Sequence, residues 1–138
     1  MANPGRRPLS SLDPVAMRIA RRVARRLARE GAEAVVLVGS HARGDAYRES
    51  DLDLHALGRG ERYRLEGVSG FLVSTSWRTA RAWRQAFRDP SEVGGVIPAW
   101  RGAILLHDPK GIAAKLQCEA TAWTWDLVEG DRKTWVAE

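Results

Sequence analysis

Two aspartates stand two residues apart in the segment Asp51–Ala56, in which polar and apolar residues alternate. Because side chains along a β-strand point to opposite faces in turn, Asp51, Asp53 and His55 are expected on one face. Two like charges this close repel each other unless a cation lies between them, so the pair indicates a divalent metal ion. Mg²⁺ needs only one or two protein carboxylates, because water and substrate phosphates complete its coordination shell. The spacing therefore predicts a magnesium site that acts on a phosphorylated substrate.

A glycine and a serine, Gly39 and Ser40, follow the valine-rich run Glu33–Val38. A glycine at the end of a buried strand lets the backbone turn sharply and approach a ligand. Ser40 can open a short helix, where free amides and a hydroxyl converge on a phosphate. Arg43 is a further candidate for a phosphate contact, and a surface arginine on that helix is an equal alternative. For the glycine and serine, the plain alternative is a turn that only ends a strand.

The spacing of apolar and turn residues predicts the elements that must position these candidates. Asp13 is expected to cap a helix that begins at Pro14 and ends near Gly31, with arginines on its exposed side. Glu33–Val38 is expected to be a central strand buried on both faces. The remaining expectations are a strand over 51–56, a hairpin of strands 63–68 and 71–77 with a turn at 69–70, a helix over 79–87, an irregular stretch or one short helix over 90–100, a strand over 103–107, and a last helix over 112–127.

These elements predict an α+β fold, in which a mixed, mostly antiparallel sheet of about four or five strands is flanked by helices. The 138 residues are enough for one compact domain and too few for two. Residues 1–12 hold two prolines and no apolar period, so we expect a flexible N-terminus there and a single domain over residues 13–138.

Composition excludes several classes of protein. Apolar residues make up 44% and charged residues 28% of the chain, a balance typical of globular proteins rather than disordered ones. The sequence holds no apolar stretch long enough to span a membrane and no signal peptide, which predicts a cytoplasmic protein. The lone cysteine, Cys118, argues against disulfides and structural zinc. No phosphate-binding P-loop motif and no serine-hydrolase motif occurs.

The order of Gly39-Ser40, ten residues, then Asp51-x-Asp53 resembles the signature of the DNA polymerase β-like nucleotidyltransferase superfamily. Its context is similar too, because the glycine and serine follow an expected buried strand and the aspartates open the next one. The resemblance extends over about residues 15–125. It includes the turn at 108–111, which looks like that of aminoglycoside and other small nucleotidyltransferases.

The resemblance implies the nucleotidyltransferase fold and a transferase reaction. A nucleoside monophosphate would pass from a nucleoside triphosphate, with ATP the favoured donor, to the hydroxyl of an unidentified acceptor, and pyrophosphate would leave. Gly39 and Ser40 would hold the triphosphate, with Arg43 as the further nucleotide-binding candidate. Asp51 and Asp53 would be the catalytic residues and would bind one or two Mg²⁺ ions, which orient the α-phosphate and neutralise its developing charge.

One departure from the family pattern matters for activity. The family supplies a third carboxylate from a following strand, and that strand aligns with Phe71–Trp77, which contains no acid. Ser74 occupies the third position, and a neutral hydroxyl is a weak ligand for Mg²⁺. Glu66, in the opposing hairpin strand, is a candidate replacement if the register allows it. The alternative to an active enzyme is therefore a catalytically weakened nucleotide-binding, regulatory or antitoxin-like module.

Partners are predicted from the tryptophans and the arginines. Two of the six tryptophans, Trp123 and Trp125, cannot both face one helix stripe, so one of them or Trp135 is expected to be exposed at a contact. Larger relatives build the acceptor site with an additional domain, so we expect a homodimer or a partner protein to complete the cleft. Nucleic-acid binding by the arginine-rich first helix is a weaker hypothesis than a solvated helix face.

Two other polar residues have plainer interpretations than catalysis. His55 is expected to be a partly buried, hydrogen-bonded residue rather than a catalytic base. Asp108, before Pro109, is expected to form a turn rather than to bind a metal.

Overall fold

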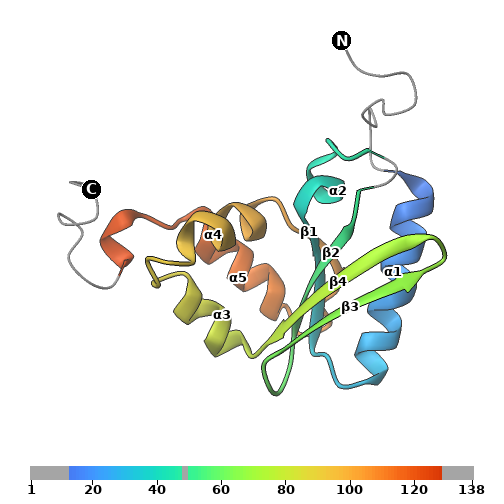
Figure 1. Cartoon of the computed structure of the whole chain (residues 1–138). Helices are drawn as coiled ribbons and strands as arrows, with labels where there is room; N and C mark the ends of the chain where they lie inside the picture. Colours follow the sequence, from blue (N-terminus) through green and yellow to red (C-terminus); the bar gives the residue numbers. More distant parts are fainter. Residues whose placement is uncertain (1–12, 48–49, 129–138) are drawn as a thin grey trace, which may run out of the picture.

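The computed structural model describes residues 13–47 and 50–128 (Figure 1). The expected flexible N-terminus, residues 1–12, and Trp135 lie outside these described residues. In chain order the elements are α1 (Pro14–Arg29), β1 (Ala34–Val38), α2 (Gly39–Arg43), β2 (Leu52–Leu57), β3 (Arg62–Val68), β4 (Phe71–Arg78), α3 (Ala80–Ala86), α4 (Val93–Arg101), β5 (Ile104–His107), α5 (Ile112–Thr121) and the 3-10 turn η2 (Trp125–Leu127).

Five strands form one mixed sheet in the order β3-β4-β2-β1-β5. β2 and β4 run parallel, whereas β1–β2, β1–β5 and β3–β4 are antiparallel pairs. All five residues of β1 are buried, as a valine-rich strand covered on both faces requires. At the edge formed by β5, the register shifts between Val35 and Val36. The predicted α+β fold with a mostly antiparallel sheet is confirmed.

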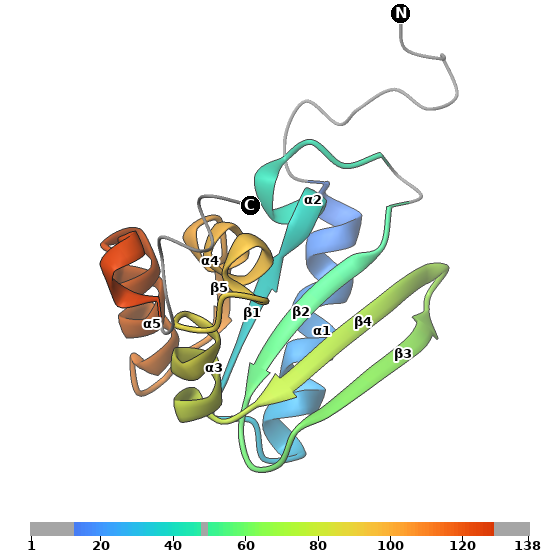
Figure 2. The same cartoon turned by 60° about the vertical axis from the view of Figure 1, so that its left-hand side comes forward.

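Helices cover the two faces of this sheet unequally (Figures 1 and 2). α1 lies along one face and packs on the β1 residues Val35 and Leu37. α3, α4 and α5 gather on the other face, where Val36 and Val38 of the same strand join their core. In Figure 2 these three helices leave the β3–β4 hairpin uncovered on their side. That face of the sheet is therefore open beside α4.

The first helix begins and ends at the expected residues. Asp13 caps it by accepting a hydrogen bond from the Val15 amide at 3.2 Å, and Gly31 follows its end with φ +111°. Arg26 forms an ion pair with Glu66 of β3, which ties the helix to the sheet. Five other arginines are exposed, as the interpretation of a solvated face predicts: Arg18, Arg21, Arg22, Arg25 and Arg29.

The hairpin forms as predicted, and its turn residues explain why. Ser69 has φ 49° and Gly70 has φ 86°, the left-handed pair that a tight two-residue hairpin turn requires. Within 90–100, where an irregular stretch or a short helix was expected, the structure has the helix α4, with Pro98 inside it.

The last helix is shorter than the sequence predicts. α5 ends at Thr121, not near residue 127, and a separate 3-10 turn follows it. Arg101 donates hydrogen bonds to the carbonyls of Ala120 (2.8 Å) and Trp123 (3.2 Å), which satisfies this helix end without further turns. Trp125 is 50% exposed, so the expectation of an exposed tryptophan near the C-terminus is confirmed.

No helix among residues 13–47 and 50–128 is long and apolar enough to cross a membrane.

We expect Gly58→Ala to destabilise the fold, because a Cβ at this buried position would lie 2.8 Å from the Trp77 ring. Overpacking of this kind costs about 1–3 kcal/mol in unfolding free energy. Urea denaturation measures the change. Gly67→Ala is the matched control, since a Cβ there meets nothing within 4 Å. Equal stability of the two variants would contradict the prediction.

Candidate active site

Asp53 lies on the central strand β2, on the face of the sheet that α3, α4 and α5 partly cover. The antiparallel register of β1 and β2 sets Asp53 opposite Val38, the last residue of β1. The parallel register of β2 and β4 sets it beside Ser74. The Ser74 hydroxyl donates a hydrogen bond of 2.7 Å to Asp53 Oδ1. One carboxylate oxygen is therefore held by the neighbouring strand.

The other oxygen, Oδ2, lies against the backbone of Gly39. This glycine opens α2 with φ +77°, and a Cβ built on it would lie 2.5 Å from Oδ2. No side chain fits between the turn and the carboxylate. The close approach predicted for Gly39 is therefore an approach to Asp53, at the start of α2.

Besides Gly39, the helix α2 carries the other two predicted nucleotide-binding residues, Ser40 and Arg43. Nearby, His41 is buried, and its Nε2 lies 2.9 Å from the Ser50 carbonyl oxygen, which ties α2 to the segment before β2. Arg43 lines the cavity above Asp53 and forms an ion pair of 3.2 Å with Asp45. Both partners of this pair are more than half exposed, so solvent screens the interaction. Arg43 can exchange Asp45 for a phosphate at little cost.

A cavity of about 370 Å³ opens over Asp53, between the sheet and α4. Ser74 and Ser76 of β4 line its floor, and Gly95, Pro98 and Ala99 of α4 form its wall. Sequence reasoning missed these α4 residues, because nothing local connects them to the aspartates. The small side chains on that face of α4 are the signal that could have suggested a space there.

His55, two residues beyond Asp53, stacks on Trp83 with ring centroids 4.2 Å apart. Its Nδ1 is buried with no hydrogen-bond partner among the described residues, so the expected hydrogen bond at this ring atom is missing. Burial, and secondly the positive charge of Arg78, lower the pKa of His55 to about 3. Near neutral pH the ring is uncharged and is too weak a base to accept a proton from a hydroxyl.

The remaining acids do not complete a three-carboxylate site. Asp51 is exposed one residue before β2 and does not line the cavity. Glu66 pairs with Val73 in the hairpin register and binds Arg26 of α1, so it lies on the opposite face of the sheet from Asp53. The candidate replacement by Glu66 is therefore wrong. Across the described residues, no three His, Cys, Asp or Glu side chains gather to hold a metal ion.

The donor set nevertheless consists of oxygen atoms, which suit a hard divalent cation such as Mg²⁺. Among the described residues, the Asp53 carboxylate accepts its side-chain hydrogen bond from the neutral Ser74 hydroxyl, and Ser40 at the start of α2 carries a further hydroxyl. A hard cation that keeps several water ligands fits one or two such carboxylates. Asp108 does not belong to this group, since its two oxygens accept from the Ala113 and Ala114 amides at the start of α5. Its predicted structural role is confirmed.

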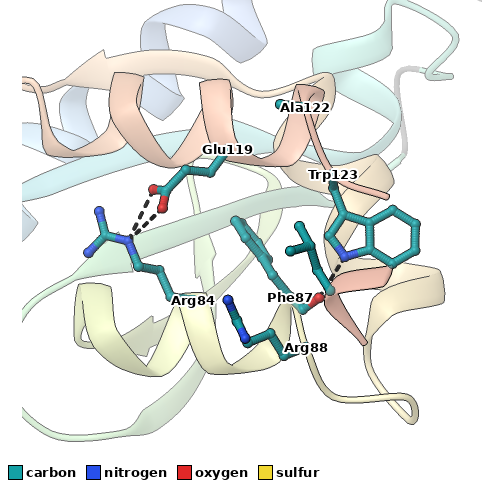
Figure 3. A pocket seen from close by; sticks show the side chains of 7 residues that line it. Arg84, Phe87, Arg88, Glu119, Ala122 and Trp123 are labelled. Carbon is teal, nitrogen blue, oxygen red and sulfur yellow. Dashed lines mark hydrogen bonds and ion pairs between the residues drawn. The ribbon is translucent and has the colours of Figure 1, made fainter. Parts of the chain in front are cut away.

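A second cavity, of about 260 Å³, lies between α3 and α5, away from Asp53 (Figure 3). Several of its polar groups pair with each other: Arg84 donates to Glu119 at 3.0 Å, and Trp123 Nε1 donates to the Phe87 carbonyl at 2.7 Å, while Arg88 also lines the cavity. Because these groups already bind each other, they are less available to a ligand than the polar groups of the cleft over Asp53.

A mixed sheet whose first strand ends in a glycine-serine turn, facing an aspartate on the next strand, defines the class of nucleotidyltransferase-like α+β domains. The family model described as "Nucleotidyltransferase domain" matches residues 17–99, and the chain belongs to this family. The predicted resemblance to the superfamily is thereby confirmed.

A solved structure, that of a nucleotidyltransferase-like protein from Exiguobacterium sibiricum 255-15, has the same fold, with a TM-score of 0.57 and 9% sequence identity. The match covers 80% of this chain and 40% of that one, so the chain spans less than half the length of this structural relative. No curated protein sequence matches the chain.

We expect Gly39→Ala to displace the Asp53 carboxylate and to abolish Mg²⁺ binding at this site, because the new Cβ would overlap Oδ2. Isothermal titration calorimetry with Mg²⁺ and ATP measures the loss. Gly60→Ala is the matched control, because Gly60 has a similar φ of +80° but no neighbour within 4 Å of its Cβ. Equal losses in both variants would show that backbone strain alone is responsible.

We expect Ser74→Asp to make stability depend on Mg²⁺. Without metal, a second carboxylate beside Asp53 costs about 1–4 kcal/mol of unfolding free energy, and the cation restores it. Thermal melting with and without Mg²⁺ measures this difference. Ser76→Asp, two residues along the same face beside His55, is the control. A metal-induced shift no larger than in the unchanged protein would contradict the prediction.

Proposed function

We propose that the chain is a Mg²⁺-dependent nucleotidyltransferase, which moves a nucleoside monophosphate from a nucleoside triphosphate, favouring ATP, to an acceptor hydroxyl. The observation that carries the proposal is the contact between the Asp53 carboxylate and the Gly39 backbone at the start of α2. It brings a negatively charged metal ligand to the turn where phosphates would bind. Family membership supports the reaction class.

In this proposal each site residue has a separate task. Asp53, with Asp51 before it, holds the metal, and Gly39, Ser40 and Arg43 bind the triphosphate. When bound, Mg²⁺ supplies positive charge that offsets the charge developing on the transferred phosphate. The acceptor oxygen forms a bond to the α-phosphorus while the bond from that phosphorus to its bridging oxygen breaks. Pyrophosphate leaves with the bonding electrons, and the hydroxyl proton passes to solvent.

The position of Ser74 favours a second candidate function. A hydroxyl stands where the family places a carboxylate, and it is already hydrogen-bonded to Asp53. A site with one acid fewer retains phosphate binding better than it retains activation of a hydroxyl. The second candidate is therefore a regulatory or antitoxin-like module that binds a nucleotide and turns it over slowly or not at all.

A homodimer or partner protein that completes the cleft stays a prediction. Tyr63, Leu65 and Leu72 are exposed on the cleft side of the hairpin, beside Ser74 and Ser76, and are the apolar residues such a partner would cover.

We expect Asp53→Asn to lower the Mg²⁺-dependent affinity for ATP by at least about tenfold, because the amide removes the charge that holds the cation. Calorimetry measures binding, and a pyrophosphate-release assay separates the two candidate functions. Glu61→Gln, an exposed acid in the loop between β2 and β3, is the control. Unchanged affinity in Asp53→Asn would contradict both candidates, whereas binding without pyrophosphate release would leave the second.

A further inference from the structure

The cleft continues beyond Asp53 into a second space along the same two strands. The cavity over Asp53, here the proximal compartment, shares His55, Ser76, Gly95 and Ala99 with a neighbouring cavity of about 320 Å³. That distal compartment extends from His55 to Arg78 and Glu92. Four shared lining residues make the two compartments one continuous trough between the strands β2 and β4 and the helix α4.

The compartments differ in the groups that they present. The proximal one contains Gly39, Arg43 and Asp53, which are the predicted phosphate and metal groups. The distal one contains hydroxyls, a paired set of charges and, behind them, the buried ring of Trp83. Its lining residues are His55, Ser76, Arg78, Trp83, Ser91, Glu92, Gly95, Val96 and Ala99.

The charges of the distal compartment cancel. Arg78 forms an ion pair of 2.9 Å with Glu92, and its guanidinium lies 4.8 Å above the centre of the Trp83 ring. Glu92 is the one carboxylate in this lining, and Arg78 already neutralises it. A polycationic ligand would find no unpaired acid in this lining to receive its charges. An uncharged ligand needs none.

At the junction of the two compartments, the Ser76 hydroxyl is available to bind a ligand. Ser76 stands beside His55 in the parallel register, and its hydroxyl makes no side-chain hydrogen bond to the described residues. A hydroxyl can donate and accept at once, so it suits a ligand that does the same. The opposite wall, at Gly95, leaves open space where a side chain would stand.

We propose that the distal compartment is the acceptor subsite, and that it binds a small, uncharged molecule with several hydroxyls, such as a polyol or a monosaccharide, rather than a polycation. This inference rests on the proposed transferase function. With the phosphates in the proximal compartment, an acceptor hydroxyl at the junction faces the α-phosphorus. Its oxygen bonds to that phosphorus, pyrophosphate leaves with the electrons of the broken bond, and the proton passes to solvent.

The first test is transfer of label from ATP that carries a radioactive α-phosphate. The full chain and Mg²⁺ are incubated with a panel of uncharged polyols and monosaccharides, and separately with a panel of aminoglycosides and polyamines. We expect labelled product with the uncharged panel. Preferential labelling of polycations, labelling of the chain itself, or no labelled product despite intact ATP binding would overturn the inference. Loss of Mg²⁺-dependent ATP binding would instead overturn the proposed function.

A blocking variant tests the place of the subsite. Gly95→Leu fills the junction, and it is expected to fold because the Cβ meets nothing within 4 Å and leucine favours a helix. Gly95 borders both compartments, so both quantities are measured, and we expect transfer to fall at least about tenfold more than ATP affinity does, since misplacing an acceptor is costly. Gly94→Leu has equally open surroundings but does not line the trough, so it is the control. Full activity in Gly95→Leu would overturn the assignment.

A charge-swap pair tests the ligand class. Arg78→Gln leaves the Glu92 carboxylate without its partner, so we expect the ratio of transfer to polycations over polyols to rise at least about tenfold. The double variant Arg78→Gln/Glu92→Gln restores neutrality, and the original preference should return. If the ratio does not change in the single variant, charge balance does not select the acceptor and the proposal fails.

Discussion

The antiparallel register of β1 and β2 is the constraint on which the site depends. It sets Val38 opposite Asp53, so the residue after Val38 must turn away directly beside a carboxylate. Only a residue without a side chain fits there, and Gly39 fills the place with φ +77°. A shift of this register by one residue would turn Asp53 into the α1 core. The packing of two strands thus fixes the distance between a turn and a charge.

A second constraint arises from polar residues on a strand that helices cover. Asp53 and His55 occupy alternate positions of β2 on the face where α3, α4 and α5 pack. A fully apolar contact above such a row is costly, because buried polar groups need partners or water. α4 meets the row with Gly95 and Ala99, and the space left by these small residues becomes the trough. The cleft therefore follows from incomplete packing at positions that local sequence sets.

The sequence predicts the elements whose signals are local. The cap at Asp13, the valine-rich strand and the hairpin turn at 69–70 each carry their own residues, and the structure has all three. The place of Ser74 beside Asp53 could also be predicted, because aligning the strand 71–77 with the family pattern puts Ser74 at the position of the third carboxylate. What sequence could not supply is contact between distant segments. Three features depend on tertiary packing. They are the α4 residues that line the cleft, the ion pair of Glu66 with Arg26, and the early end of α5, where Arg101 donates a hydrogen bond to the Ala120 carbonyl.

The two outer strands of the sheet decide how molecules of this chain can meet. β5 has four residues and an irregular register with β1, and β3 carries Arg62 and Arg64 along the opposite border. Short, irregular or charged borders are poor templates for main-chain pairing with another chain. Continuous sheets across molecules, and the fibrous aggregates that grow from them, are thereby disfavoured. Among the described residues, side chains on the faces of the molecule are better suited than these borders to a contact between chains.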